Sequence, residues 1–161
     1  MTPEQERYLN DFFVHVFNKI LAWEEQALTK VGASDLSVKE LHVLEAVHDL
    51  TERDRNTMTC VADALSIRVS SLTTAVNTLV RKGYLERGGE PGDRRVIRVR
   101  LTEKGEQANQ LHSQFHAKMI DSVAQRLGDM ELEILTASLR QLDQFFTEMA
   151  RQELPPESNE S

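Results

Sequence analysis

The chain has 161 residues, of which 40% are hydrophobic, and a net charge of -7, so it is long enough for one domain with a buried core. Its apolar runs are too short to span a bilayer, its polar N-terminus is unlike a signal peptide, and its single cysteine excludes an intrachain disulfide framework. We therefore expect a cytoplasmic protein without a membrane partner.

The positive charge is concentrated in one segment. Residues 66–104 contain nine basic and four acidic side chains, a balance of +5, whereas the rest of the chain carries -12. A local basic surface, rather than the net charge, determines contact with phosphates. The distribution therefore makes double-stranded DNA the first partner to consider.

The N-terminal third predicts three helices. Apolar side chains recur at helical spacing from Tyr8 to Val31, and Gly32 is expected to end that helix. Residues 37–40, Ser-Val-Lys-Glu, form a capping-box pattern that opens a second helix. After a polar loop, a short helix is predicted from about Thr59 to Leu65.

The next helix, Ser70 to Lys82, has two distinct faces. Its apolar residues fall on one stripe: Leu72, Ala75, Val76, Leu79 and Val80. Its other face carries short polar side chains: Ser70, Ser71, Thr73, Thr74 and Asn77. Hydroxyls contact base edges or phosphates, and Asn77 is suited to adenine, so this face favours A·T-rich DNA. A merely solvated face is the alternative interpretation.

A basic hairpin follows this helix. Tyr84 to Arg87 and Val96 to Leu101 are predicted strands, and residues 88–93 between them have turn composition. We expect Ile97, Val99 and Leu101 to anchor the hairpin on the core. A helix that fits the major groove, followed by such a hairpin, is the layout of a winged helix-turn-helix.

The C-terminal part predicts two further helices and a tail. Thr102 is the expected N-cap of a long helix, Gly128 and Asp129 separate it from the last helix, and residues 154–161 are expected to be flexible. The predicted fold class is mainly α with a small β-hairpin wing. One domain, 1–153, would comprise dimerisation helices at 4–31 and 102–151 and a DNA-binding lobe at 37–101. The long apolar terminal helices predict a homodimer.

This order of elements resembles the MarR family of bacterial regulators. The most specific stretch is LVRKGYLERGGEPGDRRVIRVRLTEKG, in which residues 93–95, Asp-Arg-Arg, stand at the family's D-x-R element. The resemblance implies that Arg95 enters the minor groove and that Asp93 orients it. Arg94 and Arg68 are then candidates for phosphate contact.

Other segments are similar to the MarR-type repressors of fatty-acid synthesis in Gram-positive bacteria. These segments include FNKILAWEE, LSVKELHVLEAV and LHSQFHAKM. The resemblance implies a repressor of fatty-acid biosynthesis genes that binds a pseudo-palindromic, A·T-rich operator, with acylated acyl carrier protein as corepressor. The expected effector pocket comprises Trp23, His42, His112, Phe115, His116 and Met119.

Two other effectors are alternatives. His112 and His116 have the i, i+4 spacing of metal ligands, and together with Glu24 and His42 they resemble the site of a zinc-dependent MarR-type repressor. The preferred interpretation is that these histidines line an effector cavity and that the protein needs no metal or other cofactor. A small aromatic or lipophilic ligand is the second alternative.

Redox sensing and catalysis have little support in the sequence. Cys60 has no adjacent basic cluster that would lower its pKa, so a structural or neutral role is expected. The chain contains no nucleophile elbow and no phosphate-binding loop. We therefore expect a DNA-binding protein and not an enzyme.

Overall fold

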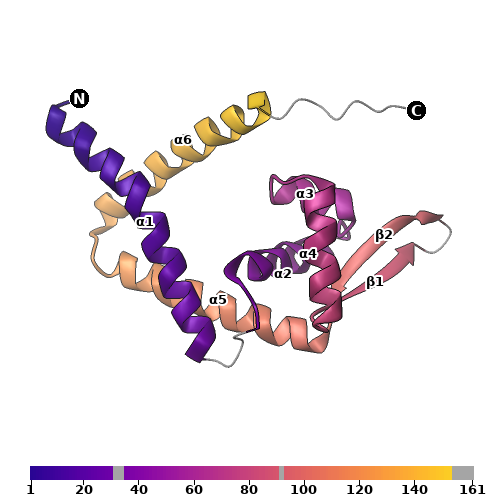
Figure 1. The fold of residues 1–161 in the computed structure, drawn as a ribbon. Helices are drawn as coiled ribbons and strands as arrows, with labels where there is room; N and C mark the ends of the chain where they lie inside the picture. The colour runs from indigo at the N-terminus through magenta and orange to yellow at the C-terminus, as the bar shows by residue number, and fades with distance from the viewer. Residues whose placement is uncertain (31–34, 91–92, 154–161) are drawn as a thin grey trace. The chain divides into compact units, whose positions relative to one another are not determined.

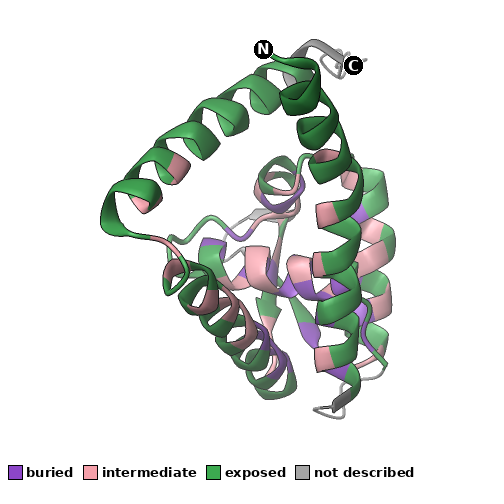
Figure 2. Ribbon diagram, turned by 90° about the vertical axis from the view of Figure 1, so that its left-hand side faces the viewer, coloured by how far each residue is buried: buried purple, intermediate pink, exposed green. Residues whose placement is uncertain are grey.

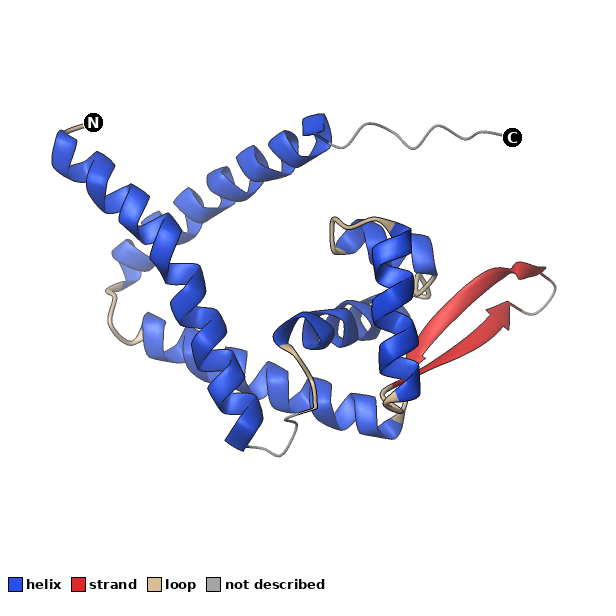
Figure 3. Cartoon of the chain, viewed as in Figure 1, coloured by secondary structure: helices blue, strands red, loops and turns tan. Residues whose placement is uncertain are grey.

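The computed structural model describes residues 1–30, 35–90 and 93–153, which form helices and one β-hairpin (Figures 1 and 3). The elements in chain order are α1 (Pro3–Lys30), α2 (Val38–Thr51), α3 (Met58–Ala64), α4 (Val69–Arg81), β1 (Leu85–Glu90), β2 (Asp93–Leu101), α5 (Glu103–Ala124) and α6 (Asp129–Glu153). The predicted fold class is thus confirmed. The predicted helix end at Gly32, the turn residues Pro91 and Gly92, and the tail at 154–161 lie outside the described residues.

The chain divides into two compact units, Met1–Phe115 and His116–Ser161. In the first unit, α2, α3, α4 and the base of the hairpin enclose an apolar core (Figure 2). Its most deeply buried side chains are Leu41, Leu44, Val47, Val61, Leu72, Val76, Leu79, Leu85 and Val99. The single-domain boundaries expected from the sequence remain a prediction.

The start of α2 has the expected capping box. The backbone N–H of Glu40 donates to the Ser37 hydroxyl over 3.3 Å, and the Glu40 carboxylate accepts from the Ser37 backbone N–H over 2.8 Å. These contacts satisfy two N–H groups that a helix start otherwise leaves without partners. The entry of the chain into the core is therefore fixed locally.

Helix α4 buries most of its predicted stripe. Leu72, Val76 and Leu79 are fully buried, whereas Val80 is 37% exposed, which corrects its expected burial. The geometry of the helix explains the difference, because eight residues at 3.6 per turn place Val80 about 80° away from Leu72 around the axis. Val80 therefore lies at the edge of the stripe.

The hairpin is longer than predicted. The antiparallel ladder continues from Leu85 opposite Leu101 to Gly89 opposite Ile97, so the expected turn residues Gly88 and Gly89 belong to a strand. Val99 is buried as expected, but Ile97 is 44% exposed. Ile97 pairs with a glycine beyond the part of the hairpin that packs on the core, so it does not anchor the wing.

The second unit comprises the end of α5, the Gly128 turn and α6. The Gly128 N–H donates to the Glu131 carboxylate over 2.8 Å, where the sequence predicted a break between helices. Several large apolar side chains of α6 are exposed: Met130, Ile134, Leu139, Leu142, Phe145, Phe146 and Met149. Among the described residues, no helix combines the length and the apolar character that a membrane crossing requires.

Candidate functional site

The polar face predicted for the helix at residues 70–82 lies on the surface of α4. Ser70, Ser71, Thr74 and Asn77 are exposed, and Thr73 is half-buried. The Thr73 hydroxyl donates its hydrogen to the Val69 carbonyl over 2.8 Å. Its oxygen can still accept a hydrogen bond, and the amide of Asn77 offers both a donor and an acceptor. The face can therefore bond to either type of group on a base edge.

Other residues expected to contact DNA precede and follow this helix in the chain. Arg68 is exposed and occupies the N-cap position of α4, where the helix N-terminus also favours an anion. The backbones of Asp93, Arg94 and Arg95 lie at the start of β2, and their side chains lie outside the described residues. The minor-groove contact expected of Arg95, its orientation by Asp93 and the phosphate contact of Arg94 remain predictions.

The base of the wing is held by a cluster of polar contacts that the sequence did not predict. Arg98 Nη1 lies 2.9 Å from both Asp54 Oδ1 and Asn56 Oδ1. The buried Asn56 in turn donates from Nδ2 to the Val99 carbonyl over 2.8 Å, and its backbone carbonyl accepts from the Val99 N–H over 3.0 Å. These contacts join the loop after α2 to β2, so Arg98 holds the wing in place.

The C-terminal end of α4 is tied to the start of α2. Lys82 Nζ lies 2.8 Å from Glu40 Oε1 and also donates to the Asp35 backbone carbonyl. Burial acts to raise the pKa of Glu40, but hydrogen bonds from Lys82 and Ser37 outweigh it, so the pKa lies below its ordinary value. The pair therefore stays ionised and fixes the orientation of α4 relative to the start of α2.

A second contact strengthens this tie. The Tyr84 hydroxyl donates to Asp35 Oδ1 over 2.7 Å, and Lys104 Nζ lies 3.9 Å from the centre of the Tyr84 ring. Burial, together with the bond to Asp35, raises the pKa of Tyr84 to about 12. The same hydrogen bond lowers the pKa of Asp35. Tyr84 therefore remains a neutral donor at physiological pH.

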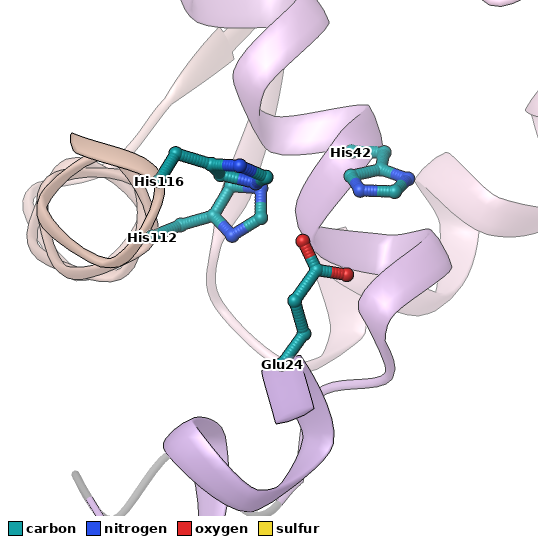
Figure 4. Close-up of side chains that lie close together, drawn as sticks. All are labelled: Glu24, His42, His112 and His116. Carbon is teal, nitrogen blue, oxygen red and sulfur yellow. The ribbon is translucent and has the colours of Figure 1, made fainter. Parts of the chain in front are cut away.

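Four residues that the sequence singled out form a cluster of metal-binding groups. Glu24 on α1, His42 on α2, and His112 and His116 on α5 each offer one ligand atom, and these atoms all lie within 4.8 Å of one another (Figure 4). Glu24, His42 and His112 belong to the first unit, and His116 follows one turn later on the same helix as His112. Glu24 and His112 are buried, and the other two are half-buried.

This cluster fits a divalent transition metal. Three imidazole nitrogens and one carboxylate oxygen are a typical donor set for Zn²⁺, whose bonds of about 2.0–2.1 Å place tetrahedral ligand atoms about 3.4 Å apart. Ligand atoms within 4.8 Å need only small side-chain movements to reach that spacing. The donor set and its spacing therefore fit one metal ion.

The other expected effector residues are aromatic or apolar. The Trp23 and Phe115 rings meet edge to face with centres 5.1 Å apart, and the His42 and His112 rings lie 5.5 Å apart. Met119 is half-buried on α5 in the second unit. The sequence did not single out Glu45, whose Oε2 lies 3.6 Å from His112 Nε2. Only the packing of α2 on α5 reveals this contact.

Comparisons with known proteins agree with this geometry. The MarR family model matches residues 34–96, which include α2, α3, α4 and most of the hairpin. The structure of Streptococcus pneumoniae FabT in complex with DNA superposes with a TM-score of 0.80 and 29% identity, covering 89% of this chain and 99% of that chain. Residues 34–96 thus match the MarR family, and the chain has the winged-helix fold of MarR-type regulators.

The chain is also similar to curated transcriptional regulators. The Bacillus subtilis HTH-type regulator YpoP is 28% identical over 147 residues, covering 89% of this chain and 94% of the relative. The Streptococcus pyogenes transcriptional regulator AdcR is 29% identical over 119 residues, covering 72% of this chain and 81% of the relative. The family consists of DNA-binding transcriptional regulators and is not an enzyme family.

Proposed function

We propose that the protein is a homodimeric transcriptional repressor that binds a pseudo-palindromic, A·T-rich operator. The observation that carries this proposal is the exposed polar face of α4, which is followed directly by a two-stranded wing. In this arrangement α4 enters the major groove and reads base edges, while Arg95 on the wing enters the flanking minor groove. Arg68 and Arg94 contact phosphates and set the register.

Exposed apolar side chains support the dimer. On α1 these are Tyr8, Leu9, Phe12, Val14, Phe17, Leu21 and Trp23, and α6 exposes a comparable set. Such surfaces are unusual on a monomer and typical of an interface. A two-fold dimer places two recognition helices about one helical turn of DNA apart, which matches a palindromic site.

The test begins with selection of duplexes from a randomised library on the purified protein. We expect the selected sequences to be palindromic and rich in A·T. Arg95→Ala should weaken binding to the selected duplex by tenfold or more, the order of about 1–3 kcal/mol, and leave the dimer intact. Lys118→Ala removes the same charge from an exposed position on α5 and serves as the control. Equal affinities of wild type and Arg95→Ala would refute the role of the wing.

We further propose that the regulated genes are those of fatty-acid biosynthesis and that acylated acyl carrier protein is the corepressor. The 29% identity with FabT over most of both chains and the segments noted in the sequence support this proposal. The exposed Arg81, Arg87 and Arg100, to which no DNA contact is assigned, offer the acidic carrier a complementary surface. Long-chain acylated carrier protein should tighten operator binding, whereas the unacylated carrier should not. Equal effects of the two forms would overturn the proposal.

A divalent metal is the second candidate effector, and the cluster of Glu24, His42, His112 and His116 favours it. A bound metal would supply a fixed charge that joins ligands on α1, α2 and α5. A metal changes DNA binding only if its affinity differs between the conformation that binds DNA and the conformation that does not. Zn²⁺ should change operator affinity at least tenfold and a chelator should reverse the change. No change in affinity across a Zn²⁺ titration would exclude this effector.

A further inference from the structure

Helices α2 and α5 meet along a row of polar side chains. His42 and His112 lie with their ring centres 5.5 Å apart, and His48 Nδ1 lies 3.0 Å from Glu106 Oε2. Between these contacts, Glu45 Oε2 lies 3.6 Å from His112 Nε2. Glu45 follows His42 by three residues, so both side chains lie on the face of α2 that packs against α5.

The two residues of the middle contact differ in burial. The His112 side chain is 2% exposed, whereas that of Glu45 is 42% exposed. A carboxylate at the rim of the interface therefore approaches an imidazole at its centre. A separation of 3.6 Å is an ionic contact and is longer than a hydrogen bond.

An imidazole that binds a metal uses one ring nitrogen and carries a proton on the other. The partner of the protonated nitrogen determines which tautomer is present and how the ring is oriented. His112 Nε2 faces the carboxylate of Glu45. A proton on Nε2 would leave the lone pair of Nδ1 for the metal.

We propose that Glu45 is a positioning residue for the metal cluster: its carboxylate holds the proton of His112 on Nε2 and thereby directs Nδ1 to the metal. The proposal rests on the metal-binding function suggested above. Contraction of the cluster from separations of up to 4.8 Å requires small movements of the ligand side chains. The Glu45 side chain is 42% exposed, so it has room to approach His112 to hydrogen-bonding distance.

Metal affinity of the full-length protein tests this role. Zn²⁺ binding is measured by competition with a chromophoric chelator for the wild type, Glu45→Gln, Glu45→Ala and Asp49→Asn. Asp49 is exposed on the same helix, so Asp49→Asn removes an equal charge one turn away. Loss of the contact should weaken Zn²⁺ binding about 10–100-fold in both Glu45 variants, as removal of a carboxylate partner of a ligating histidine does. The affinity of Asp49→Asn should match that of the wild type.

A spectroscopic measurement separates positioning from a general effect on folding. In the Zn²⁺-bound wild type, proton–nitrogen correlation spectra of the imidazole rings should show His112 protonated on Nε2 and bound through Nδ1. The Glu45→Gln variant should lose this preference while its circular dichroism spectrum is unchanged. Equal Zn²⁺ affinities of the wild type and the Glu45 variants, or binding through His112 Nε2, would overturn the role of Glu45 alone. Absence of Zn²⁺ binding by the wild type would overturn the metal site itself and with it this proposal.

Discussion

Asn56, in the loop before α3, and Arg98, on β2, are joined by a hydrogen bond that holds the base of the wing. The Oδ1 of Asn56 accepts from Arg98 Nη1 over 2.9 Å, and its Nδ2 donates to the carbonyl of Val99 over 2.8 Å. Asn56 is 2% exposed, so both polar ends of a buried amide are used by strand β2. The direction in which the wing leaves the core is therefore set by a loop that would not itself touch DNA.

Replacement of Asn56 by alanine should destabilise the protein by about 1–3 kcal/mol, because it leaves the Val99 carbonyl and the Arg98 guanidinium with one partner fewer in a buried setting. Urea unfolding measures this change. Asn77→Ala is the matched control, since Asn77 is exposed on α4. We expect it to change stability by less than about 0.5 kcal/mol. An unchanged unfolding midpoint for Asn56→Ala would show that the hydrogen bonds of Asn56 contribute little to stability.

Gly105→Ala should also destabilise the protein. A Cβ at this position in α5 would lie 2.2 Å from the Tyr84 backbone oxygen, so the helix must move away from the base of the wing. Such overpacking costs about 1–3 kcal/mol or more. Gly88→Ala, whose Cβ would meet nothing within 4 Å, is the control. Thermal unfolding compares the two, and equal stabilities of the variants would contradict the close approach of α5.

The ion pair between Glu40 and Lys82 predicts a loss of stability in acid. The pKa of Glu40 is lower in the folded protein than its ordinary value of 4.5, so the unfolded chain binds the proton more tightly. The ion pair therefore contributes fully to the free energy of unfolding when the pH is above the ordinary pKa of Glu40. This contribution is lost as the pH falls through the pKa of the folded state. Between about pH 5 and pH 3, the free energy of unfolding should fall more steeply for the wild type than for Glu40→Gln. If the free energy of unfolding falls equally steeply with pH in both proteins, Glu40 does not cause the loss of stability in acid.

If the exposed apolar side chains of α1 form the dimer interface, a charged residue introduced among them should weaken the homodimer. Phe17 is 59% exposed in the single chain, and a glutamate in its place would bury an unpaired charge in the proposed dimer. Phe17→Glu should shift the protein toward monomer in sedimentation velocity experiments. Ile67→Glu places the same charge at an exposed position in the DNA-binding lobe and should leave the mass unchanged. A Phe17→Glu variant that sediments as the wild type does would exclude α1 from the interface.

The parts of the fold that local patterns specify could be predicted from the sequence. Ser37 and Glu40 lie three residues apart and form their capping box within one turn, and the two faces of α4 follow from helical periodicity. The length of the wing was underestimated, because Gly88 and Gly89 have turn composition but are held in the ladder by their partners on β2. Pairing across the hairpin outweighed local propensity.

The polar contacts between distant segments could not be predicted. Asn56 and Arg98 are 42 residues apart, and neither residue type nor spacing distinguishes a buried asparagine from one in a solvated loop. All four residues of the metal cluster were named from the sequence as an alternative interpretation, since His112 and His116 have a recognisable spacing and the resemblance added Glu24 and His42. Glu45 was missed because its role depends on how α2 packs against α5.

The central claim is that α4 and the wing read a specific DNA sequence. Its most direct test is fluorescence anisotropy at physiological salt, which compares the affinity of the protein for the selected palindrome with that for a scrambled duplex of equal composition. We predict a preference of about 10³-fold or more for the palindrome, and a marked reduction of that preference in a Thr74→Ala, Asn77→Ala double variant. Equal affinity for the two duplexes, or an undiminished preference in the double variant, would contradict the assignment of α4 as the recognition helix.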